Sequence, residues 1–246
     1  TGRLMVAALA VAQLMLAPLA AQAGDPLLAE TVEFNGAVLY RTLKTPALVL
    51  GVVRNGQIAV AGFGEIADGS KREPNGDTVM RIGSITKAFT GEVLASLVAD
   101  KTVRLTDRLD KHLKWGVPVP ERDGRPIRLI DLATQTSGLP REPQREPGPP
   151  EDPFKTLTNK TLADALRTTP LLFAPGSGAL YSNFGFYLLA AALASANGGQ
   201  PYEALLRQRV LGPAKLTATS YAVTEAQKPN LMQGHDFDRS PLPDVP

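Results

Sequence analysis

An Asn-Gly pair between two apolar runs constrains the first part of this chain more than any other feature. The runs cover residues 47–54 and 57–63, and Asn55 and Gly56 separate them. Both residues of a two-residue hairpin turn need positive φ, which asparagine and glycine tolerate better than other residues. The pattern therefore predicts two antiparallel strands joined by a tight turn. Residues 28–42, ahead of the hairpin, fit either a helix or a loop.

Helical patterns dominate the chain after the hairpin. Residues 84–100 carry an apolar stripe at helical spacing, and residues 184–196 form a strongly apolar segment that ends in Asn-Gly-Gly. Shorter helices are predicted at 127–133, 162–168 and 202–211. The apolar run 78–82, just before the first stripe, is expected to be a short strand.

The composition excludes several kinds of site. With 246 residues, 43% of them hydrophobic, the chain has material for one large domain or two closely packed lobes. It has no cysteine, which excludes a thiol nucleophile, a disulfide framework and a thiolate metal site. Only two histidines are present, so a three-histidine zinc centre is impossible. The net charge of +2 gives no indication of nucleic-acid binding.

The sequence gives neither histidine the nucleophile motif with which a catalytic histidine commonly works. His112 lies in a polar stretch that is predicted to be on the surface, and His235 lies in a loop. Either could serve as the base of a catalytic triad, but no G-x-S-x-G nucleophile motif occurs in the chain. The low histidine content therefore favours lysine and tyrosine as proton carriers.

The first residues form a separate segment. Residues 4–20 are almost wholly apolar, Arg3 precedes them, and residues 21–23 fit a signal-peptidase cleavage site. We expect residues 1–23 to be a cleaved signal peptide that places the rest of the chain in a bacterial periplasm. The alternative is an uncleaved membrane anchor, since about twenty apolar residues can span a bilayer.

Two polar motifs indicate a chemical function. Ser84 and Lys87 form an S-x-x-K pattern at the start of a predicted helix, and Tyr181 and Asn183 form a Y-x-N pattern. Residues three apart on a helix share a face, so Lys87 can contact and activate the Ser84 hydroxyl. Tyr181 can pass a proton to a leaving group, and Asn183 can hold a substrate amide. The set predicts an active-serine acyl-transfer site; the alternative makes Ser84 a helix N-cap and Lys87 a solvated residue.

A proline-rich stretch lies between these two motifs. Residues 140–153 contain six prolines with arginine and glutamate interleaved, which excludes regular secondary structure. We interpret the stretch as a solvated loop. The alternative is a rim beside a substrate cleft.

Taken together, these motifs resemble the class C β-lactamase-like serine hydrolases. The resemblance covers about residues 45–235 and rests on the S-x-x-K and Y-x-N patterns, on Thr-Ser-Gly-Leu-Pro at 136–140 and on Pro-Gly at 175–176. The run from Thr136 to Glu142 is similar to one in low-molecular-weight penicillin-binding carboxypeptidase/endopeptidases. The resemblance implies an α/β (α+β) fold of the β-lactamase/transpeptidase type, with an antiparallel-sheet lobe, a helical lobe and a cleft between them.

The same resemblance implies a domain division and a role for each motif residue. Residues 24–115 are expected to form mainly the sheet lobe with the nucleophile helix, and residues 116–212 mainly the helical lobe. Ser84 is the acylated nucleophile and its backbone N–H an oxyanion donor. Lys87 and Tyr181 form a coupled proton-transfer pair, and Asn183 binds the substrate's side-chain amide. No cofactor or metal is expected.

One family motif is not found in this sequence. The resemblance implies a K-T-G or H-x-G triplet on a late strand, where it forms a cleft wall and supplies the second oxyanion donor, and no such triplet follows Tyr181. We therefore expect this chain to be a fragment that lacks the C-terminal strands and is inactive by itself.

The resemblance implies a periplasmic D,D-peptidase that trims peptidoglycan peptides and binds penicillins. A class C-type β-lactamase or an esterase is one alternative, and a non-catalytic penicillin- or peptidoglycan-binding module is another. Ser182, in the middle of the Y-x-N pattern, favours the peptidase because class C β-lactamases commonly carry alanine there. The expected partners are peptidoglycan peptides or β-lactams, not nucleic acid, with membrane contact only through the signal peptide. The sequence does not indicate an oligomeric state.

Overall fold

The structure is a computed structural model that describes residues 25–243, so the predicted signal peptide at 1–23 lies outside the described residues. The described chain divides into two compact units. The first comprises residues 25–65 and 69–77, and the second comprises residues 66–68 and 78–243. Within the described residues, no helix is long and apolar enough to cross a bilayer.

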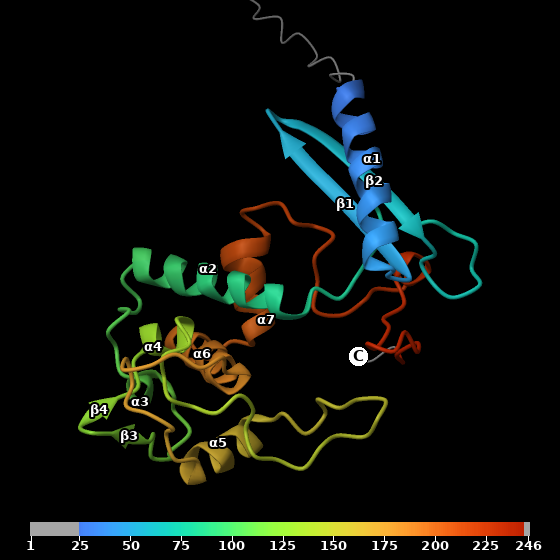
Figure 1. Cartoon of the computed structure of the whole chain (residues 1–246). Coiled ribbons are helices and arrows are strands. Elements are labelled where there is room, and N and C mark those ends of the chain that lie inside the picture. The colour runs from blue at the N-terminus through green and yellow to red at the C-terminus, as the bar shows by residue number, and fades with distance from the viewer. Residues whose placement is uncertain (1–24, 244–246) are drawn as a thin grey trace, which may run out of the picture. The chain divides into compact units, whose positions relative to one another are not determined.

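The first unit consists of a helix and a hairpin (Figure 1). Helix α1 spans Pro26–Leu43, so the ambiguous segment ahead of the hairpin is helical. The Asp25 side chain accepts hydrogen bonds from two backbone N–H groups of the first turn, and Pro26 occupies a position that needs no N–H donor. Lys44 ends the helix in the left-handed conformation, with φ of 51°.

The predicted hairpin is confirmed. Strands β1 (Ala47–Arg54) and β2 (Gln57–Gly64) pair antiparallel, with Arg54 opposite Gln57. Asn55 and Gly56 have φ of 50° and 77°, as a two-residue turn requires. The buried hydrophobic cluster of this unit consists of side chains from the helix and the hairpin: Leu28, Val32 and Ala59.

The second unit is mainly helical. Its helices are α2 (Thr86–Ala99), α3 (Leu109–His112), α4 (Leu129–Ala133), α5 (Asn159–Thr168), α6 (Asn183–Ala196) and α7 (Tyr202–Leu206), which continues as a π-helical segment, Arg207–Leu211. Two 3₁₀ turns, Gly83–Ile85 and Lys228–Asn230, and a small hairpin of β3 (Glu121–Arg122) and β4 (Arg125–Pro126) complete it. The predicted helices are confirmed, with bounds that move by a few residues.

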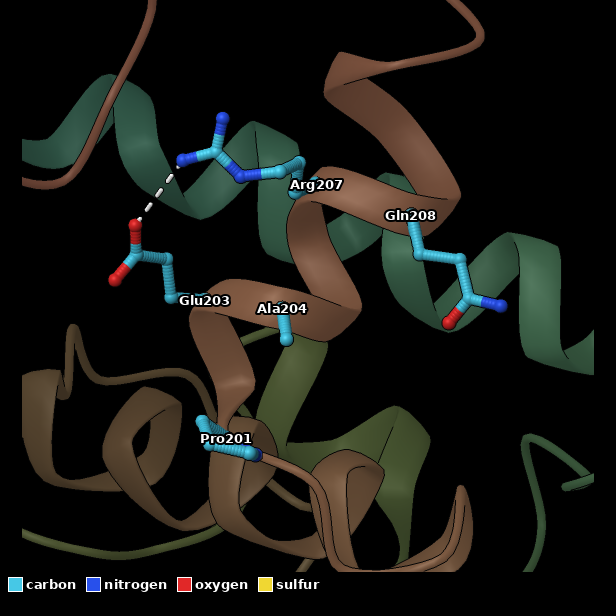
Figure 2. A pocket seen from close by; sticks show the side chains of 5 residues that line it. All are labelled: Pro201, Glu203, Ala204, Arg207 and Gln208. Carbon is cyan, nitrogen blue, oxygen red and sulfur yellow. Dashed lines mark hydrogen bonds and ion pairs between the residues drawn. The ribbon is translucent and has the colours of Figure 1, made fainter.

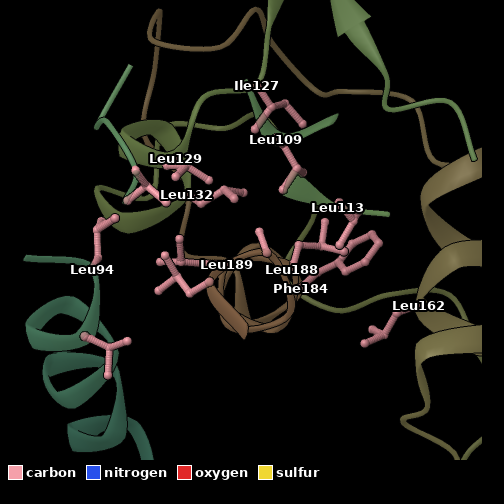
Figure 3. Packing of buried hydrophobic residues seen from close by; sticks show 14 of the residues in the cluster. Leu94, Leu109, Leu113, Ile127, Leu129, Leu132, Leu162, Phe184, Leu188 and Leu189 are labelled. Carbon is pink, nitrogen blue, oxygen red and sulfur yellow. The ribbon is translucent and has the colours of Figure 1, made fainter. Parts of the chain in front are cut away.

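Helix α6 lies at the centre of the core of this unit. Phe184, Leu188, Leu189, Ala192 and Leu193 on α6 have no exposed surface, and apolar side chains from α2, α4 and α5 belong to the same core (Figure 3). A helix that is apolar nearly all round its surface is stable only when it is buried. The core therefore fixes the position of α6.

The stretch 78–82 is not a strand, contrary to prediction. Only Val79 makes a β-bridge, to Leu231, through Val79 N–H to the Asn230 carbonyl and Met232 N–H to the Val79 carbonyl. Met80 and Ile82 are 43% and 36% exposed. A short apolar run can form either a strand or an extended connection. Which of the two it forms depends on whether the fold places another strand beside it.

His112 is also not a surface residue, contrary to prediction. Its side chain is buried and its Nε2 lies 2.9 Å from Oδ2 of Asp107. Asp107 also accepts a hydrogen bond from Lys111, which, with His112, holds the pKa of the Asp107 carboxyl well below its usual range. The prediction failed because it was based on the polar residues next to His112, whereas one side of this short helix, with Leu109 and His112, is buried.

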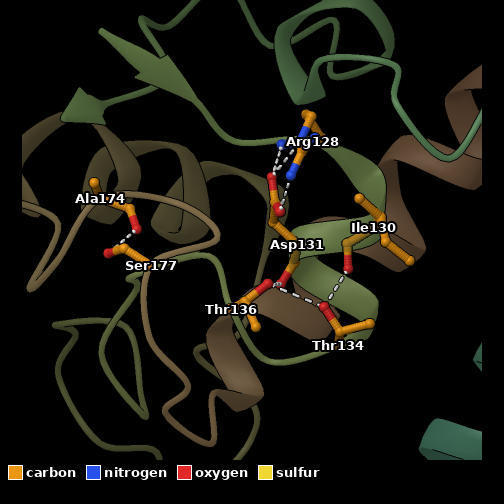
Figure 4. A network of polar contacts seen from close by, with 7 residues as sticks. All are labelled: Arg128, Ile130, Asp131, Thr134, Thr136, Ala174 and Ser177. Atoms are coloured by element: carbon orange, nitrogen blue, oxygen red, sulfur yellow. Dashed lines mark hydrogen bonds and ion pairs between the residues drawn. The ribbon is translucent and has the colours of Figure 1, made fainter. Parts of the chain in front are cut away.

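The segment 134–140 connects α4 to the loop that follows. Asp131, which is 1% exposed, accepts hydrogen bonds from the backbone and guanidinium of Arg128, and its own carbonyl accepts from Thr136 N–H (Figure 4). Gly138 then passes against another segment: its carbonyl accepts from Leu172 N–H, and its φ is 79°. A Cβ added at Gly138 would lie 2.3 Å from the Phe173 carbonyl oxygen.

We expect Gly138→Ala to lower the free energy of unfolding by about 3 kcal/mol, because it adds a backbone clash to a left-handed conformation. Gly124→Ala is the matched control: Gly124 has φ of 69° but no atom within 4 Å of an added Cβ. The control should lose only about 1 kcal/mol, the cost of the left-handed conformation alone. Urea denaturation of both variants measures the difference, and equal losses would contradict the close approach at Gly138.

Candidate active site

Ser84 lies at the entrance to helix α2. It occupies the 3₁₀ turn Gly83–Ile85, which leads directly into α2, and its side chain is exposed. Lys87 follows in the first turn of α2, and its Nζ donates a hydrogen bond to Ser84 Oγ at 3.3 Å. The spacing of three residues therefore brings the two side chains together on one face, as predicted.

Tyr181 reaches the same hydroxyl from a distant part of the chain. Its Oη lies 2.6 Å from Ser84 Oγ, within hydrogen-bond distance. The chain on both sides of Tyr181 is held by Gln135, whose backbone carbonyl accepts from Leu180 N–H and whose side-chain oxygen accepts from Ser182 N–H. The residues of the 134–140 segment thus place Tyr181 next to Ser84.

Asn183 completes the group from the first turn of α6. Its Oδ1 accepts a hydrogen bond from Lys87 Nζ at 2.7 Å. Lys87 therefore contacts both Ser84 and Asn183, and it lies 4.8 Å from the centre of the Tyr181 ring. The structure thus brings together the four residues that the two sequence motifs predicted to form the site.

The helix N-cap interpretation of Ser84 is wrong. The N-cap of α2 is Ile85, and neither the 3₁₀ turn nor α2 has a side-chain capping hydrogen bond. The Ser84 hydroxyl instead contacts Tyr181 and Lys87. A serine that serves only as a cap directs its oxygen to backbone N–H groups of its own helix, which Ser84 does not do.

The electrostatic surroundings favour the charged form of Tyr181. The Lys87 ammonium has the largest effect, followed by the Ser84 hydroxyl and the Arg141 guanidinium, and together they lower the pKa of the Tyr181 phenol. Arg141 lies over the Tyr181 ring, with its Cζ 5.0 Å from the ring centre. Nearby cations stabilise a phenolate, so at a given pH a larger fraction of this tyrosine is deprotonated, and able to accept a proton, than of an isolated one.

Two residues of the site were missed in the sequence. Glu142 accepts a hydrogen bond from Asn183 Nδ2, and Arg141 contacts the Tyr181 ring. Both lie at the start of the 140–153 stretch, so its first residues line the site while the stretch as a whole has no regular structure, as predicted. The Thr136–Glu142 run contains both residues and is the sequence signal that could have located them.

The two histidines lie in other contacts. His112 bonds to Asp107, and His235 lies 3.1 Å from Oδ1 of Asp68. Among residues 25–243, no group of three His, Cys, Asp or Glu side chains could hold a metal ion.

A shallow hollow of about 460 Å³ lies elsewhere on the second unit. It is lined by Pro201, Glu203, Ala204, Arg207 and Gln208 at α7 and the π-helical segment (Figure 2). Two of these residues, Glu203 and Arg207, form an exposed ion pair at 3.2 Å. Its lining residues differ from those around Ser84, so the hollow is not part of this site.

The chain is similar in sequence to β-lactamases and to a D-alanyl-D-alanine carboxypeptidase/endopeptidase. A family model described as Beta-lactamase matches residues 27–246. The chain is 39% identical over 186 residues to the D-alanyl-D-alanine-carboxypeptidase/endopeptidase AmpH of Escherichia coli K12, covering 75% of this chain and 48% of that protein. It is 30% identical over 197 residues to a β-lactamase of Pseudomonas fluorescens, covering 79% of this chain and 51% of that one. The chain therefore spans about half the length of the curated relatives it matches.

Solved structures show the same fold. A β-lactamase/D-alanine carboxypeptidase from Yersinia pestis, complexed with citrate, superposes with a TM-score of 0.76 at 34% identity, covering 89% of this chain and 62% of that one. A class C β-lactamase superposes with a TM-score of 0.75 at 19% identity, which bears on the fold alone. The predicted β-lactamase/transpeptidase-like fold is confirmed, and the chain belongs to the β-lactamase family.

Proposed function

We propose that this chain carries the acylation site of a periplasmic active-serine D,D-peptidase that cleaves peptidoglycan peptides and is acylated by penicillins. The observation that carries the proposal is the contact of Ser84 Oγ with Tyr181 Oη at 2.6 Å, with Lys87 bridging to Asn183. The sequence similarity to a carboxypeptidase/endopeptidase supports the choice of substrate. The periplasmic location rests on the signal-peptide pattern of residues 1–23.

The reaction begins with proton transfer from Ser84. As its oxygen attacks the carbonyl carbon of the scissile amide, the proton passes to the coupled pair of Lys87 and Tyr181. The negative charge that develops on the carbonyl oxygen is stabilised by the Ser84 backbone N–H, which lies at the N-terminal end of the helix.

The intermediate then collapses with cleavage of the carbon–nitrogen bond. Tyr181 returns a proton to the leaving amine, and the acyl group stays bonded to Ser84 as an ester. Water hydrolyses this ester and releases the shortened peptide. With a penicillin, the same attack opens the β-lactam amide, but the leaving amine stays tethered to the acyl group. Asn183 would bind the side-chain amide of the acyl donor.

The β-lactamase and the esterase are the second candidate, since one of the relatives is a β-lactamase. Ser182 does not separate the candidates. Ser182 is 1% exposed, and its hydroxyl donates to the Pro140 carbonyl and accepts from Gly185 N–H. Its role is to cap α6, so it has no contact to offer a substrate. Stable labelling by a fluorescent penicillin would favour the peptidase, and rapid loss of the label with nitrocefin turnover would favour the β-lactamase.

A non-catalytic binding module is the third candidate. A module that only binds has no need for a lysine and a tyrosine that both contact the serine hydroxyl. The expectation that the chain by itself releases no D-alanine stays a prediction.

In the whole protein, we expect Ser84→Ala to abolish covalent labelling by a fluorescent penicillin, because Ser84 carries the aliphatic hydroxyl that contacts both Lys87 and Tyr181. Intact-protein mass spectrometry measures the adduct. Ser96→Ala, on the same helix α2, is the control and should label like the wild type. An adduct on the Ser84→Ala protein would show that the nucleophile is another residue.

In the whole protein, we expect Lys87→Ala and Tyr181→Phe each to slow acylation by about 10²- to 10⁴-fold, the usual contribution of a positioned acid or base. The double variant should lose little more, since residues that act as one proton-transfer unit are not additive. Stopped-flow fluorescence with a labelled penicillin gives the rate constants. Fully additive losses would mean that the two side chains act independently.

The acylation rate should depend on the charge at Arg141. Arg141→Met removes a cation that lowers the pKa of Tyr181, so the pKa rises and the rising limb of the pH–rate profile moves to higher pH. Arg141→Lys keeps the charge and should move the limb less. Lys87 also lowers this pKa, Tyr187 interacts with Tyr181, and Glu142 bonds to Asn183; both variants leave these groups in place. An unchanged profile in Arg141→Met would show that Tyr181 does not carry this proton.

A further inference from the structure

The segment Pro140–Glu142 is tied to the start of α6 by its backbone. The Pro140 carbonyl accepts from the Ser182 hydroxyl at 2.7 Å. The Arg141 carbonyl accepts from the N–H groups of Asn183 and Phe184 at 2.8 and 3.1 Å. Glu142 therefore extends from a fixed backbone position beside Asn183, although it opens a proline-rich loop.

The hydrogen-bonding capacities around Asn183 allow one orientation of its amide. The Lys87 ammonium can only donate, so the oxygen of the amide must face it, as observed at 2.7 Å. An ionised Glu142 can only accept, so the NH₂ group must face it, as observed. A rotation of the amide by half a turn would place two donors together at Lys87 and two acceptors together at Glu142.

We propose that Glu142 is a positioning residue of the acylation site, whose carboxylate holds the Asn183 amide so that its oxygen stays on the Lys87 ammonium. This inference rests on the proposed function and deepens it. Glu142 acts through Asn183 and Lys87 on the geometry of Ser84, and it takes no proton in the reaction.

The physical reason lies in how Lys87 is held. A lysine side chain has four rotatable bonds, and its ammonium is ordered only as far as its partners fix it. Ser84 Oγ is a long contact at 3.3 Å, whereas Asn183 Oδ1 is a close one at 2.7 Å. The Asn183 amide therefore holds the Lys87 ammonium more closely than Ser84 does. It can do so only while the amide itself keeps its orientation.

The first test measures acylation of the whole protein by a labelled penicillin. Glu142→Ala should lower the rate constant of the acylation step by about ten- to a hundredfold, with little change in the affinity of the initial complex. Glu142→Gln keeps a side-chain oxygen that can accept from Asn183, and it should restore part of the rate. Glu146→Gln is the matched control, since Glu146 is an exposed residue of the same loop whose contacts to Arg145 and Thr156 use its backbone carbonyl. It should react like the wild type.

A double-mutant cycle separates positioning from a general loss of structure. In the Asn183→Ala background, Glu142→Ala should cost less than twofold, because the group through which Glu142 acts is already gone. The full loss in that background would overturn the proposal, as would wild-type acylation by Glu142→Ala.

A second measurement does not depend on activity. In protein labelled with ¹⁵N-asparagine, the side-chain NH₂ hydrogens of Asn183 should exchange with solvent at least several-fold faster in Glu142→Ala than in the wild type, with Glu146→Gln unchanged. Equal exchange rates in all three proteins would overturn the proposal. If the whole wild-type protein fails to react with penicillin while the exchange differs as expected, the proposed function fails and the positioning of Asn183 by Glu142 stands.

Discussion

The hydrogen bonds between residues 140–141 and the first turn of α6 are the constraint on which the site depends. The first N–H groups of any helix have no partner within that helix, and here two of them are satisfied by the Arg141 carbonyl and one by the Ser182 hydroxyl. The same hydroxyl donates to Pro140, so a single serine joins the loop to the helix. Because Tyr181 and Asn183 flank this serine, any shift of the loop would move both of them relative to Ser84.

The core makes this junction stiff. Helix α6 contributes a row of fully buried side chains, and α2 packs in the same core through Val93, Leu94 and Leu97. Protein interiors are packed about as densely as organic crystals, so the beginnings of these two helices hold a fixed relation. The fixed positions of the two helix ends in turn set the distance between Ser84, just before α2, and Tyr181, just before α6. The site therefore sits at the ends of buried helices, where short polar side chains need little flexibility to meet.

Charge arrangement then decides what the site can do. Lys87 contacts Ser84 and Asn183, and with Arg141 it surrounds the Tyr181 phenol with positive charge. These cations favour the phenolate form, which is the form able to accept the serine proton. Glu142 places its negative charge on the far side of the Asn183 amide from Lys87. The hydrogen bonds thus form a chain in which Asn183 donates to Glu142, Lys87 donates to Asn183, and Lys87 also donates to Ser84.

The sequence by itself determined the local features of this protein. The Asn-Gly turn fixed the hairpin register through positive φ, the apolar periodicities located the helices, and the spacing of Ser84 and Lys87 made their contact a consequence of helix geometry. Only the tertiary structure decided the rest. It left 78–82 without a neighbouring strand, buried His112 against Asp107, and brought Arg141 and Glu142 to residues some forty positions later. Local patterns follow from torsion angles and residue spacing, whereas contacts across the chain follow from which helices share a core, and no short window of sequence contains that information.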